Sequence, residues 1–184
     1  MIELKNFTYK TNKILFDGAS FKAPSTGMIG IAGESGCGKT TFLKIISKQI
    51  HVNSMVNDAA SIFYGNQDAL LKKDLTIAQQ FELIESIYNR EHDQNTIDEL
   101  FNSLNIKASL SQKYDSCSLG EKKRIMIALS VYSNSPCIIL DEPLSSVDYE
   151  DKHSIMKLLK EYSHDRVIIL TIHDEEFDEY LDIK

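Results

Sequence analysis

The eight residues from Gly33 to Thr40 constrain this chain more than any other segment. They read Gly-Glu-Ser-Gly-Cys-Gly-Lys-Thr and fit the spacing Gly-x4-Gly-Lys-Ser/Thr. Glycines let successive backbone N–H groups turn toward a phosphate, and a following helix N-terminus presents partial positive charge to the same anion. An apolar run, residues 28–32, precedes the segment, and apolar residues at helical spacing follow it. This strand, loop and helix pattern predicts a phosphate-binding loop rather than a ligand-free glycine turn.

Two residues at the end of the loop have specific predicted roles. Lys39 is expected to reach the β- and γ-phosphates, and the Thr40 hydroxyl to bind Mg²⁺. A helix N-terminus could make the Cys37 thiol reactive, but filling a small slot beside the backbone is the simpler role. The other residues predicted to contact the nucleotide belong to the loop or the first helical turn: Gly33, Glu34, Ser35, Gly36, Cys37, Gly38 and Thr41.

Composition narrows the class of protein. A chain of 184 residues suits one domain with a substantial core. Its net charge of −7 argues against a general nucleic-acid binder, because such binding depends largely on Lys and Arg. Nothing resembles a signal peptide, and the apolar runs are too short to span a bilayer, so we expect a cytoplasmic chain. The odd number of cysteines, three, argues against a disulfide framework.

Hydrophobic periodicity predicts an α/β fold with a mostly parallel sheet. Strands are predicted at 2–9, 14–23, 28–32, 60–64, 137–140 and 167–172, the first two as a small antiparallel element. Helices are predicted at 39–49, 77–88, 97–104, 122–132 and 155–162. We therefore predict one domain, with a core of about residues 1–67 and 134–184 and an inserted helical subdomain of about 68–133.

Two carboxylates, Asp141 and Glu142, follow the fully apolar strand 137–140. Such a strand is typical of a parallel sheet covered on both faces, and ligands bind at the carboxyl ends of its strands. Alone, the pair could equally be an acidic turn. Behind a phosphate-binding loop, Asp141 suits Mg²⁺ coordination and Glu142 suits the orientation of an attacking water. His173, which ends the next strand, could donate a hydrogen bond to the γ-phosphate.

The order of these motifs resembles the nucleotide-binding domain of ATP-binding cassette (ABC) ATPases, a P-loop NTPase fold of the RecA-like class, along essentially the whole chain. Residues 33–40 match the family's Walker A motif and residues 137–142 its Walker B motif with the catalytic glutamate. His173 matches the switch histidine. Gln67 matches the Q-loop glutamine, which implies a role in catalysis and near Mg²⁺.

Three further segments fall into register with the same family. Residues 118–121, Ser-Leu-Gly-Glu, match the signature Leu-Ser-Gly-Gly-Gln, and residues 144–148 match the D-loop, which ends at Asp148. Tyr9 matches the aromatic residue that stacks on adenine, although a strand tyrosine is more often a packing residue. The resemblance implies a head-to-tail dimer, in which Ser118 and Gly120 of one copy contact the ATP of the other, with help from a helix that begins near Lys122.

The chain departs from the family pattern at three points. The signature has Cys117 for the leading Leu and Leu119 for the first Gly, which puts efficient hydrolysis in doubt. The interval from Lys39 to Gln67 is shorter than usual, which suggests that a surface strand and turn are missing. The chain ends soon after His173, which suggests that the family's terminal strand is missing too.

The resemblance implies an ATPase subunit of a membrane transporter. Residues from about Gln67 to Tyr88 would contact a multi-span permease, which would hold the chain on the inner face of the cell membrane. A Ser-Leu-Gly signature on a solitary cassette favours an exporter of peptide or antibiotic cargo. The alternative is a soluble ABC ATPase that regulates another assembly. A P-loop kinase would need an acceptor site and a lid, and would not explain residues 118–121 together with His173.

Overall fold

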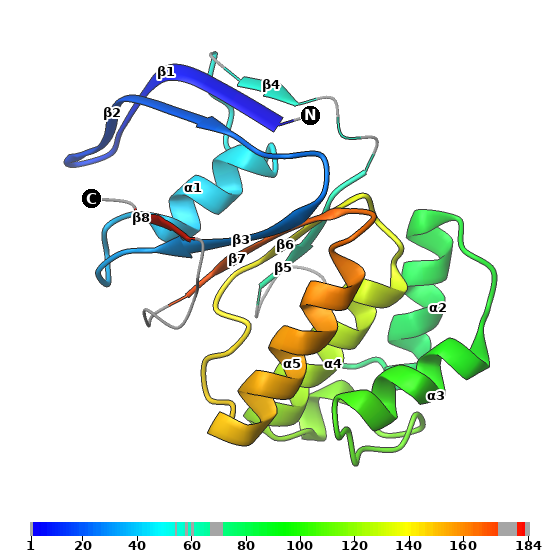
Figure 1. Ribbon diagram of the computed structural model, residues 1–184. Helices are drawn as coiled ribbons and strands as arrows, with labels where there is room; N and C mark the ends of the chain where they lie inside the picture. Colours follow the sequence, from blue (N-terminus) through cyan, green and yellow to red (C-terminus); the bar gives the residue numbers. More distant parts are fainter. Residues whose placement is uncertain are drawn as a thin grey trace.

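The computed structural model describes residues 2–53, 55–57, 59, 61–66, 72–172 and 180–182 (Figure 1). The strands are β1 (Ile2–Lys10), β2 (Ile14–Lys22), β3 (Gly27–Ala32), β4 (Met55–Asn57), β5 (Phe63–Gly65), β6 (Cys137–Leu140), β7 (Val167–Thr171) and β8 (Tyr180–Asp182). The helices are α1 (Lys39–Ile46), α2 (Ile77–Tyr88), α3 (Gln94–Ser103), α4 (Leu119–Tyr132) and α5 (Tyr149–Tyr162), with a short 3-10 turn at Tyr114–Ser116.

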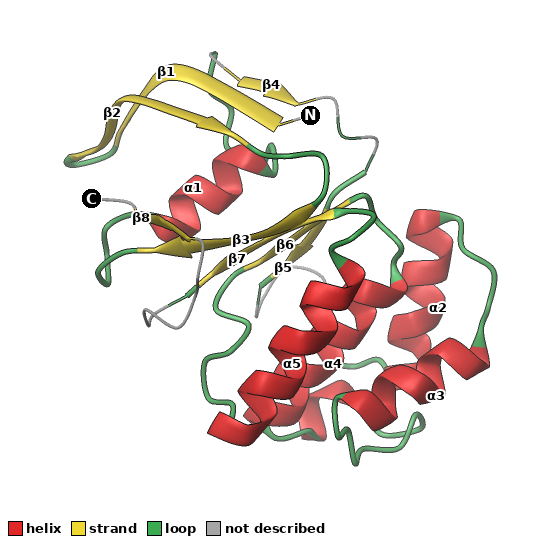
Figure 2. Cartoon of the chain, in the orientation of Figure 1, coloured by secondary structure: helices red, strands yellow, loops and turns green. Residues whose placement is uncertain are grey.

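The main sheet has the strand order β5-β6-β7-β3-β8, and each of its neighbouring pairs is parallel. Helix α1 lies between this sheet and the smaller one, while α2 to α5 cover the opposite face (Figure 2). Every residue of β6 and β7 is buried, as expected for strands covered on both faces. The predicted fold class, a P-loop α/β sheet with a small antiparallel element, is confirmed.

Alternate residues of the central strands enter different hydrophobic clusters, because side chains along a strand point to opposite faces. Ile139 and Ile169 pack with α1 and the small sheet. Ile138 and Leu140 pack instead with the helices on the other face. Because those helices share one cluster with the sheet, the division between a core and a helical subdomain (68–133) stays a prediction.

Two strands that the sequence led us to expect to be missing are present. The small sheet has the order β2-β1-β4, and β4 pairs antiparallel with β1 (Ile2 opposite Asn57), so the surface strand is present. Helix α1 ends at Ile46 instead of Gln49, which leaves enough chain for β4. Strand β8 pairs parallel with β3, so the expectation that a terminal strand is missing was also wrong. Both strands have only three residues, too few to show an alternating pattern.

Helix α4 begins at Leu119, three residues before the predicted start. Ser118 is its N-cap: the Ser118 hydroxyl accepts from the Glu121 N–H at 3.2 Å, and the Glu121 carboxylate accepts from the Ser118 N–H at 3.1 Å. This reciprocal capping box satisfies two N–H groups that would otherwise lack partners. The segment first interpreted as a turn therefore forms the first turn of the helix.

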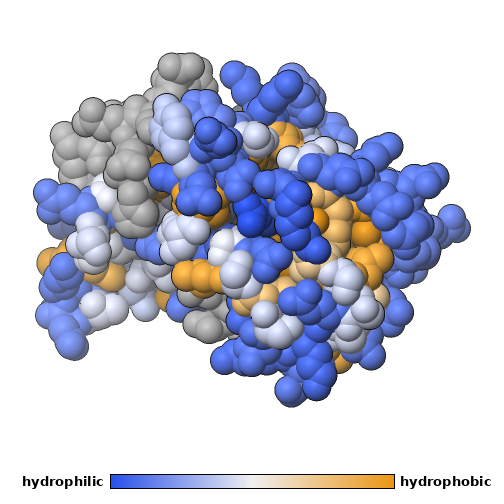
Figure 3. All heavy atoms as spheres, turned by 90° about the horizontal axis from the view of Figure 1, so that it is seen from below, coloured by the Kyte–Doolittle hydropathy of each residue, from blue (hydrophilic) through white to orange (hydrophobic). Residues whose placement is uncertain are grey.

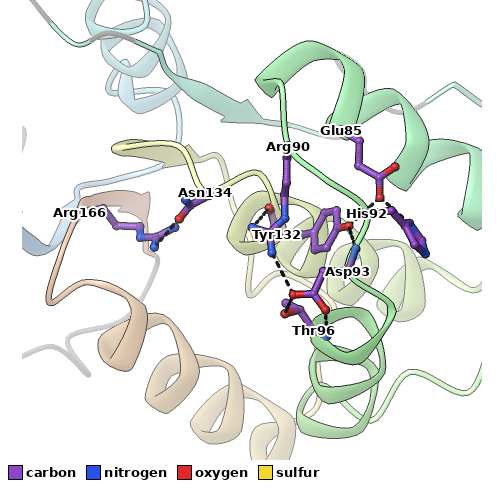
Figure 4. A network of polar contacts seen from close by, with 8 residues as sticks. All are labelled: Glu85, Arg90, His92, Asp93, Thr96, Tyr132, Asn134 and Arg166. Atoms are coloured by element: carbon purple, nitrogen blue, oxygen red, sulfur yellow. Dashed lines mark hydrogen bonds and ion pairs between the residues drawn. The ribbon is translucent and has the colours of Figure 1, made fainter.

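A polar network joins the helices (Figure 4). Tyr132 of α4 is fully buried, and its hydroxyl donates to Glu85 Oε1 at 2.6 Å and accepts from the Asp93 N–H at 3.0 Å. The Arg90 guanidinium lies 4.1 Å from the Tyr132 ring centroid and donates to the Tyr132 carbonyl at 2.7 Å. The network links α2, α4 and the start of α3, because Glu85 lies on α2 and Asp93 caps α3.

Candidate functional site

The loop after β3 owes its shape to glycine. Gly33, Gly36 and Gly38 have φ angles of 144°, 78° and 115°, values that residues with a Cβ rarely adopt. Gly38 is also the N-cap of α1, and it has no side chain with which to satisfy the first-turn N–H groups. Those N–H groups are therefore available to an anion.

The Lys39 side chain lies inside the loop. It is only 6% exposed, and its ammonium donates to the Gly33 carbonyl at 2.6 Å and to the Glu34 carbonyl at 3.1 Å. Phosphate oxygens are stronger acceptors for an ammonium than neutral carbonyls, because their negative charge adds Coulomb attraction to the hydrogen bond. The loop therefore holds a cation where it could meet a phosphate. Glu34, Ser35 and Thr40 are exposed, whereas Cys37 and Thr41 are half-buried.

The carboxyl ends of four strands reach the same level of the sheet. In the register, Gly65 pairs with Leu140, Leu140 with Leu170, and Leu170 with Gly30. Asp141, the first residue after β6, therefore lies at the same edge of the sheet as the loop after β3, and only β7 separates the two strands. Neighbouring strands are about 4.8 Å apart, so the two backbones are separated by roughly 10 Å.

Thr171, at the end of β7, organises the residues after β6. Its hydroxyl donates to Asp141 Oδ1 at 3.0 Å and accepts from the Glu142 N–H at 2.6 Å. The Asp141 N–H donates to the Gly65 carbonyl at 2.8 Å. Sequence reasoning missed Thr171, although a hydroxyl residue at the end of an otherwise apolar strand was a usable signal.

Glu142 has a left-handed backbone, with φ at 50°, and its carbonyl accepts from the Ser145 N–H at 3.3 Å and from two side chains. Lys123 Nζ donates to it at 2.8 Å and the Ser145 hydroxyl at 2.9 Å. Burial lowers the pKa of Lys123, and the charges of Glu142 and Asp141 act in the opposite direction. Sequence reasoning included Ser145 in the segment 144–148 without predicting this contact, and it missed Lys123, which looks like part of an ordinary basic run.

The predicted signature residues lie at a different part of the molecule. The N-terminus of α4 lies at the lower end of the helical layer in Figure 1, away from the loop after β3. A Cβ at Gly120 would lie 3.4 Å from the Ser146 carbonyl, so the first turn of α4 packs close to the loop 144–148. Leu119 is 50% exposed. Asp148 is exposed at the N-cap of α5, and its side chain makes no capping hydrogen bond.

The remaining predicted site residues divide into two groups. Tyr9 lies on β1, half-buried, and packs against the cluster that contains Phe7 and Phe16. Gln67 and His173 lie outside the described residues. Their roles, like those of all the site residues, stay predictions.

Asp141 and Thr40 are the described residues best suited to Mg²⁺. Within the described ranges, no group of three or more His, Cys, Asp or Glu residues could hold a metal ion. Mg²⁺ does not require one, because it usually binds through one or two carboxylates, several waters and substrate phosphates. One carboxylate and one hydroxyl at this edge of the sheet fit that chemistry.

Comparisons with known proteins address the family directly. The model of the ABC transporter family matches residues 16–145. The chain belongs to the ABC transporter family. This match confirms the predicted family and the prediction that the chain is an ATPase.

Individual relatives of this ABC protein include ATP-binding proteins named for export and others named for import. The cytochrome c biogenesis ATP-binding export protein CcmA of Reclinomonas americana is 30% identical over 182 residues, covering 90% of this chain and 81% of the relative. The molybdenum import ATP-binding protein ModC of Rhodopseudomonas palustris is 31% identical over 173 residues, covering 84% and 45%.

Solved structures share the fold of this ABC protein. A putative ABC transporter ATP-binding protein from Pyrococcus furiosus superimposes with a TM-score of 0.85 at 18% identity, covering 99% of this chain and 96% of the other. A dimeric post-hydrolysis state of an ATP-binding cassette, bound to ADP and Pi, superimposes with a TM-score of 0.81 at 22% identity, covering 100% and 94%.

Proposed function

We propose that this chain is the ATP-hydrolysing subunit of an ABC exporter and that it works as a head-to-tail pair beneath a membrane permease. The observation that supports this most is the position of Lys39. Its ammonium is enclosed by the loop after β3. Asp141 and Glu142 follow β6 at the same edge of the sheet, and only β7 separates β6 from β3.

The residues of this edge divide the work of hydrolysis. Lys39 and the N–H groups from Gly33 to Thr41 bind the phosphates, and Tyr9 stacks on the adenine. Thr40, Asp141 and Gln67 hold Mg²⁺, which when bound neutralises charge on the phosphates. Glu142 orients the attacking water and accepts its proton, and His173 donates a hydrogen bond to the γ-phosphate.

A second copy completes the site. Ser118 and Gly120 belong to the N-terminal end of α4. Figure 1 shows this end of the helix away from the loop after β3, which supports the use of both residues on a nucleotide held by the partner. The first-turn N–H groups of α4 would then face the γ-phosphate, and Asp148 would lie at the contact between the copies. A cassette of the same fold is dimeric when bound to ADP and Pi, which supports the pairing of two copies.

The contact with the permease would involve residues from about Gln67 to Tyr88. Ile87 of α2 is 52% exposed, which gives this helix an apolar side chain suited to a helix of a partner. Figure 3, which views the molecule from below, shows an apolar area among the hydrophilic side chains of this face. In the described part of the chain, no helix is long and apolar enough to cross a membrane.

Export is favoured by three relatives of this chain, each named as a cytochrome c biogenesis ATP-binding export protein. The permease selects the cargo, so a peptide or antibiotic stays a prediction. An ATPase that regulates a soluble assembly is the competing possibility. Co-purification with a multi-span membrane protein, and faster hydrolysis on mixing the two, would support the exporter; failure of both would favour the soluble ATPase.

Substitution of Glu142 tests the catalytic assignment. Loss of a general base reduces rates by about 10²- to 10⁴-fold, so Glu142→Gln should lower kcat by at least about 100-fold. The variant should still bind ATP and should accumulate as a dimer in sedimentation experiments. Glu161→Gln removes the same charge from an exposed position at the end of α5 and serves as the control. Hydrolysis that survives in Glu142→Gln would remove Glu142 from the mechanism.

A further inference from the structure

Lys123 is buried at a position where its charge is costly. The side chain is 2% exposed, and its ammonium donates to the Glu142 carbonyl at 2.8 Å. Burial disfavours the charged form and lowers the pKa of this lysine. Lysine is almost never fully buried unless it is paired. A methionine would fill similar volume without this cost, so the hydrogen bond itself is the feature to explain.

The backbone that accepts this bond is strained. The left-handed region is disfavoured for a residue with a Cβ, because the Cβ comes too close to the following carbonyl oxygen, and Glu142 has φ at 50°. Three groups hold it there: Thr171 accepts from its N–H, while Lys123 and Ser145 donate to its carbonyl. Strain of this kind persists only where surrounding groups fix it. The direction of the Glu142 side chain depends on the same backbone.

Lys123 belongs to the helix that begins with the signature residues. Gly120 lies three residues before it on α4, about one turn, and packs close to the Ser146 carbonyl. Helix α4 therefore contacts the loop after β6 at two levels, through Gly120 and through Lys123. Any movement of the first turn of α4 would be transmitted to the backbone of Glu142.

We propose that Lys123 is a positioning residue that fixes the backbone of Glu142 and ties it to α4. The proposal rests on the proposed function, because it assumes that Glu142 orients the attacking water. Lys123 does not touch the nucleotide in this mechanism. Its loss should therefore lower kcat and leave nucleotide binding nearly unchanged.

The experiment compares Lys123→Met with wild type and with a matched control. Misplacing a catalytic group by about 1 Å can cost 10²-fold in rate, so we expect Lys123→Met to lower kcat by about 10- to 100-fold. The KM for ATP should change less than about threefold, because ground-state binding is retained. Lys123→Arg, which keeps a long cationic donor, should recover part of the lost kcat.

Arg124→Met is the control. Arg124 lies next to Lys123 on α4 and forms an ion pair with Asp151 of α5, so its loss removes a cation and a contact between helices without touching Glu142. It should lower the melting temperature while kcat stays within about twofold. Equal losses of kcat in the Lys123 and Arg124 variants would overturn the proposal. So would full activity in Lys123→Met, or failure of both Lys123 variants to fold.

Amide hydrogen exchange separates this inference from the proposed function. Exchange across residues 142–147 should be faster in Lys123→Met than in wild type and unchanged in Arg124→Met. If wild type releases no phosphate from ATP, the proposed function fails. Unchanged exchange in Lys123→Met would refute the positioning role in either case.

Discussion

Left-handed backbone occurs both among the helices and at the strand ends, but different residues carry it. After α2 and α3 it is carried by Asn89 and Asn105, a residue type that tolerates this region at low cost. In the loop after β6 it is carried by Glu142 and Ser146, for which the cost is higher. Helices α2 and α3 thus end in residues suited to this conformation, whereas the loop after β6 is held in shape by its neighbours, as is common at functional sites.

Charged side chains also differ between the two regions in the partners that they bind. Among the helices, Glu85 accepts from the Tyr132 hydroxyl, and Arg90 donates to the Tyr132 carbonyl and pairs with the Asp93 carboxylate at 3.8 Å (Figure 4). At the strand ends, the partners of the Lys39 ammonium among the described residues are the neutral carbonyls of its own loop. Substitutions among the helices should therefore change stability and leave nucleotide binding intact, and those at the strand ends should do the reverse.

The largest effect expected at the strand ends is that of Lys39→Met on ATP affinity. A hydrogen bond between charged groups contributes about 1.5–3 kcal/mol, so affinity should fall by about 10- to 100-fold. The free energy of unfolding should change by less than about 1 kcal/mol, since the loss of two hydrogen bonds from the ammonium to loop carbonyls is offset by removal of the cost of a buried charge. Calorimetric titration with ATP and thermal unfolding measure the two quantities.

Lys44→Met is the matched control for Lys39→Met. Lys44 lies in the last turn of the same helix, α1, and its removal takes away the same charge. Its ATP affinity should stay within about twofold of wild type. An unchanged affinity in Lys39→Met would contradict the predicted role of the loop.

Tyr132→Phe should give the largest loss of stability among the helices. It deprives Glu85 of a donor and the Asp93 N–H of an acceptor in a buried setting, which should cost about 2 kcal/mol of unfolding free energy. ATP affinity should not change. A variant that lost affinity while keeping its stability would reverse the contrast between the two regions.

The pH dependence of the same variant sharpens the prediction. Burial, and then the hydrogen bond to Glu85, raise the pKa of Tyr132 above its ordinary value. The unfolded chain therefore loses this proton first, and the stabilisation present below about pH 10 is lost as the pH rises through the folded-state pKa. Tyr132→Phe lacks this loss, so the stability gap measured by urea unfolding at pH 8 should narrow above pH 10. A constant gap would show that the Tyr132 pKa is not raised.

Sequence reasoning succeeded where structure is encoded locally. The loop from Gly33 to Thr40 depends on glycines and a lysine at fixed spacing, and β6 on four consecutive apolar residues. The start of α4 was also encoded locally, because Ser118 and Glu121 form a capping box, but the segment was interpreted as a turn. That error was one of interpretation.

Other features depend on contacts between distant residues. Thr171 reaches Glu142 across 29 positions and Lys123 reaches it across 19, so neither role leaves a pattern in the neighbouring sequence. Strands β4 and β8 form by pairing with β1 and β3 rather than from strong local preference. Features of this kind require the fold to be known.

The smallest predicted effect concerns Asn89, one of the left-handed residues that end the helices. Asn89 ends α2 with φ at 51°, and its N–H donates to the Glu85 carbonyl. Alanine tolerates this conformation less well, so Asn89→Ala should cost about 1 kcal/mol of unfolding free energy in urea denaturation. Asn89→Gly is the control and should be at least as stable as wild type, because glycine adopts this region freely. If Asn89→Ala cost nothing, the left-handed residues of the two regions would not differ in the way described, because alanine would then bear this conformation as readily as asparagine.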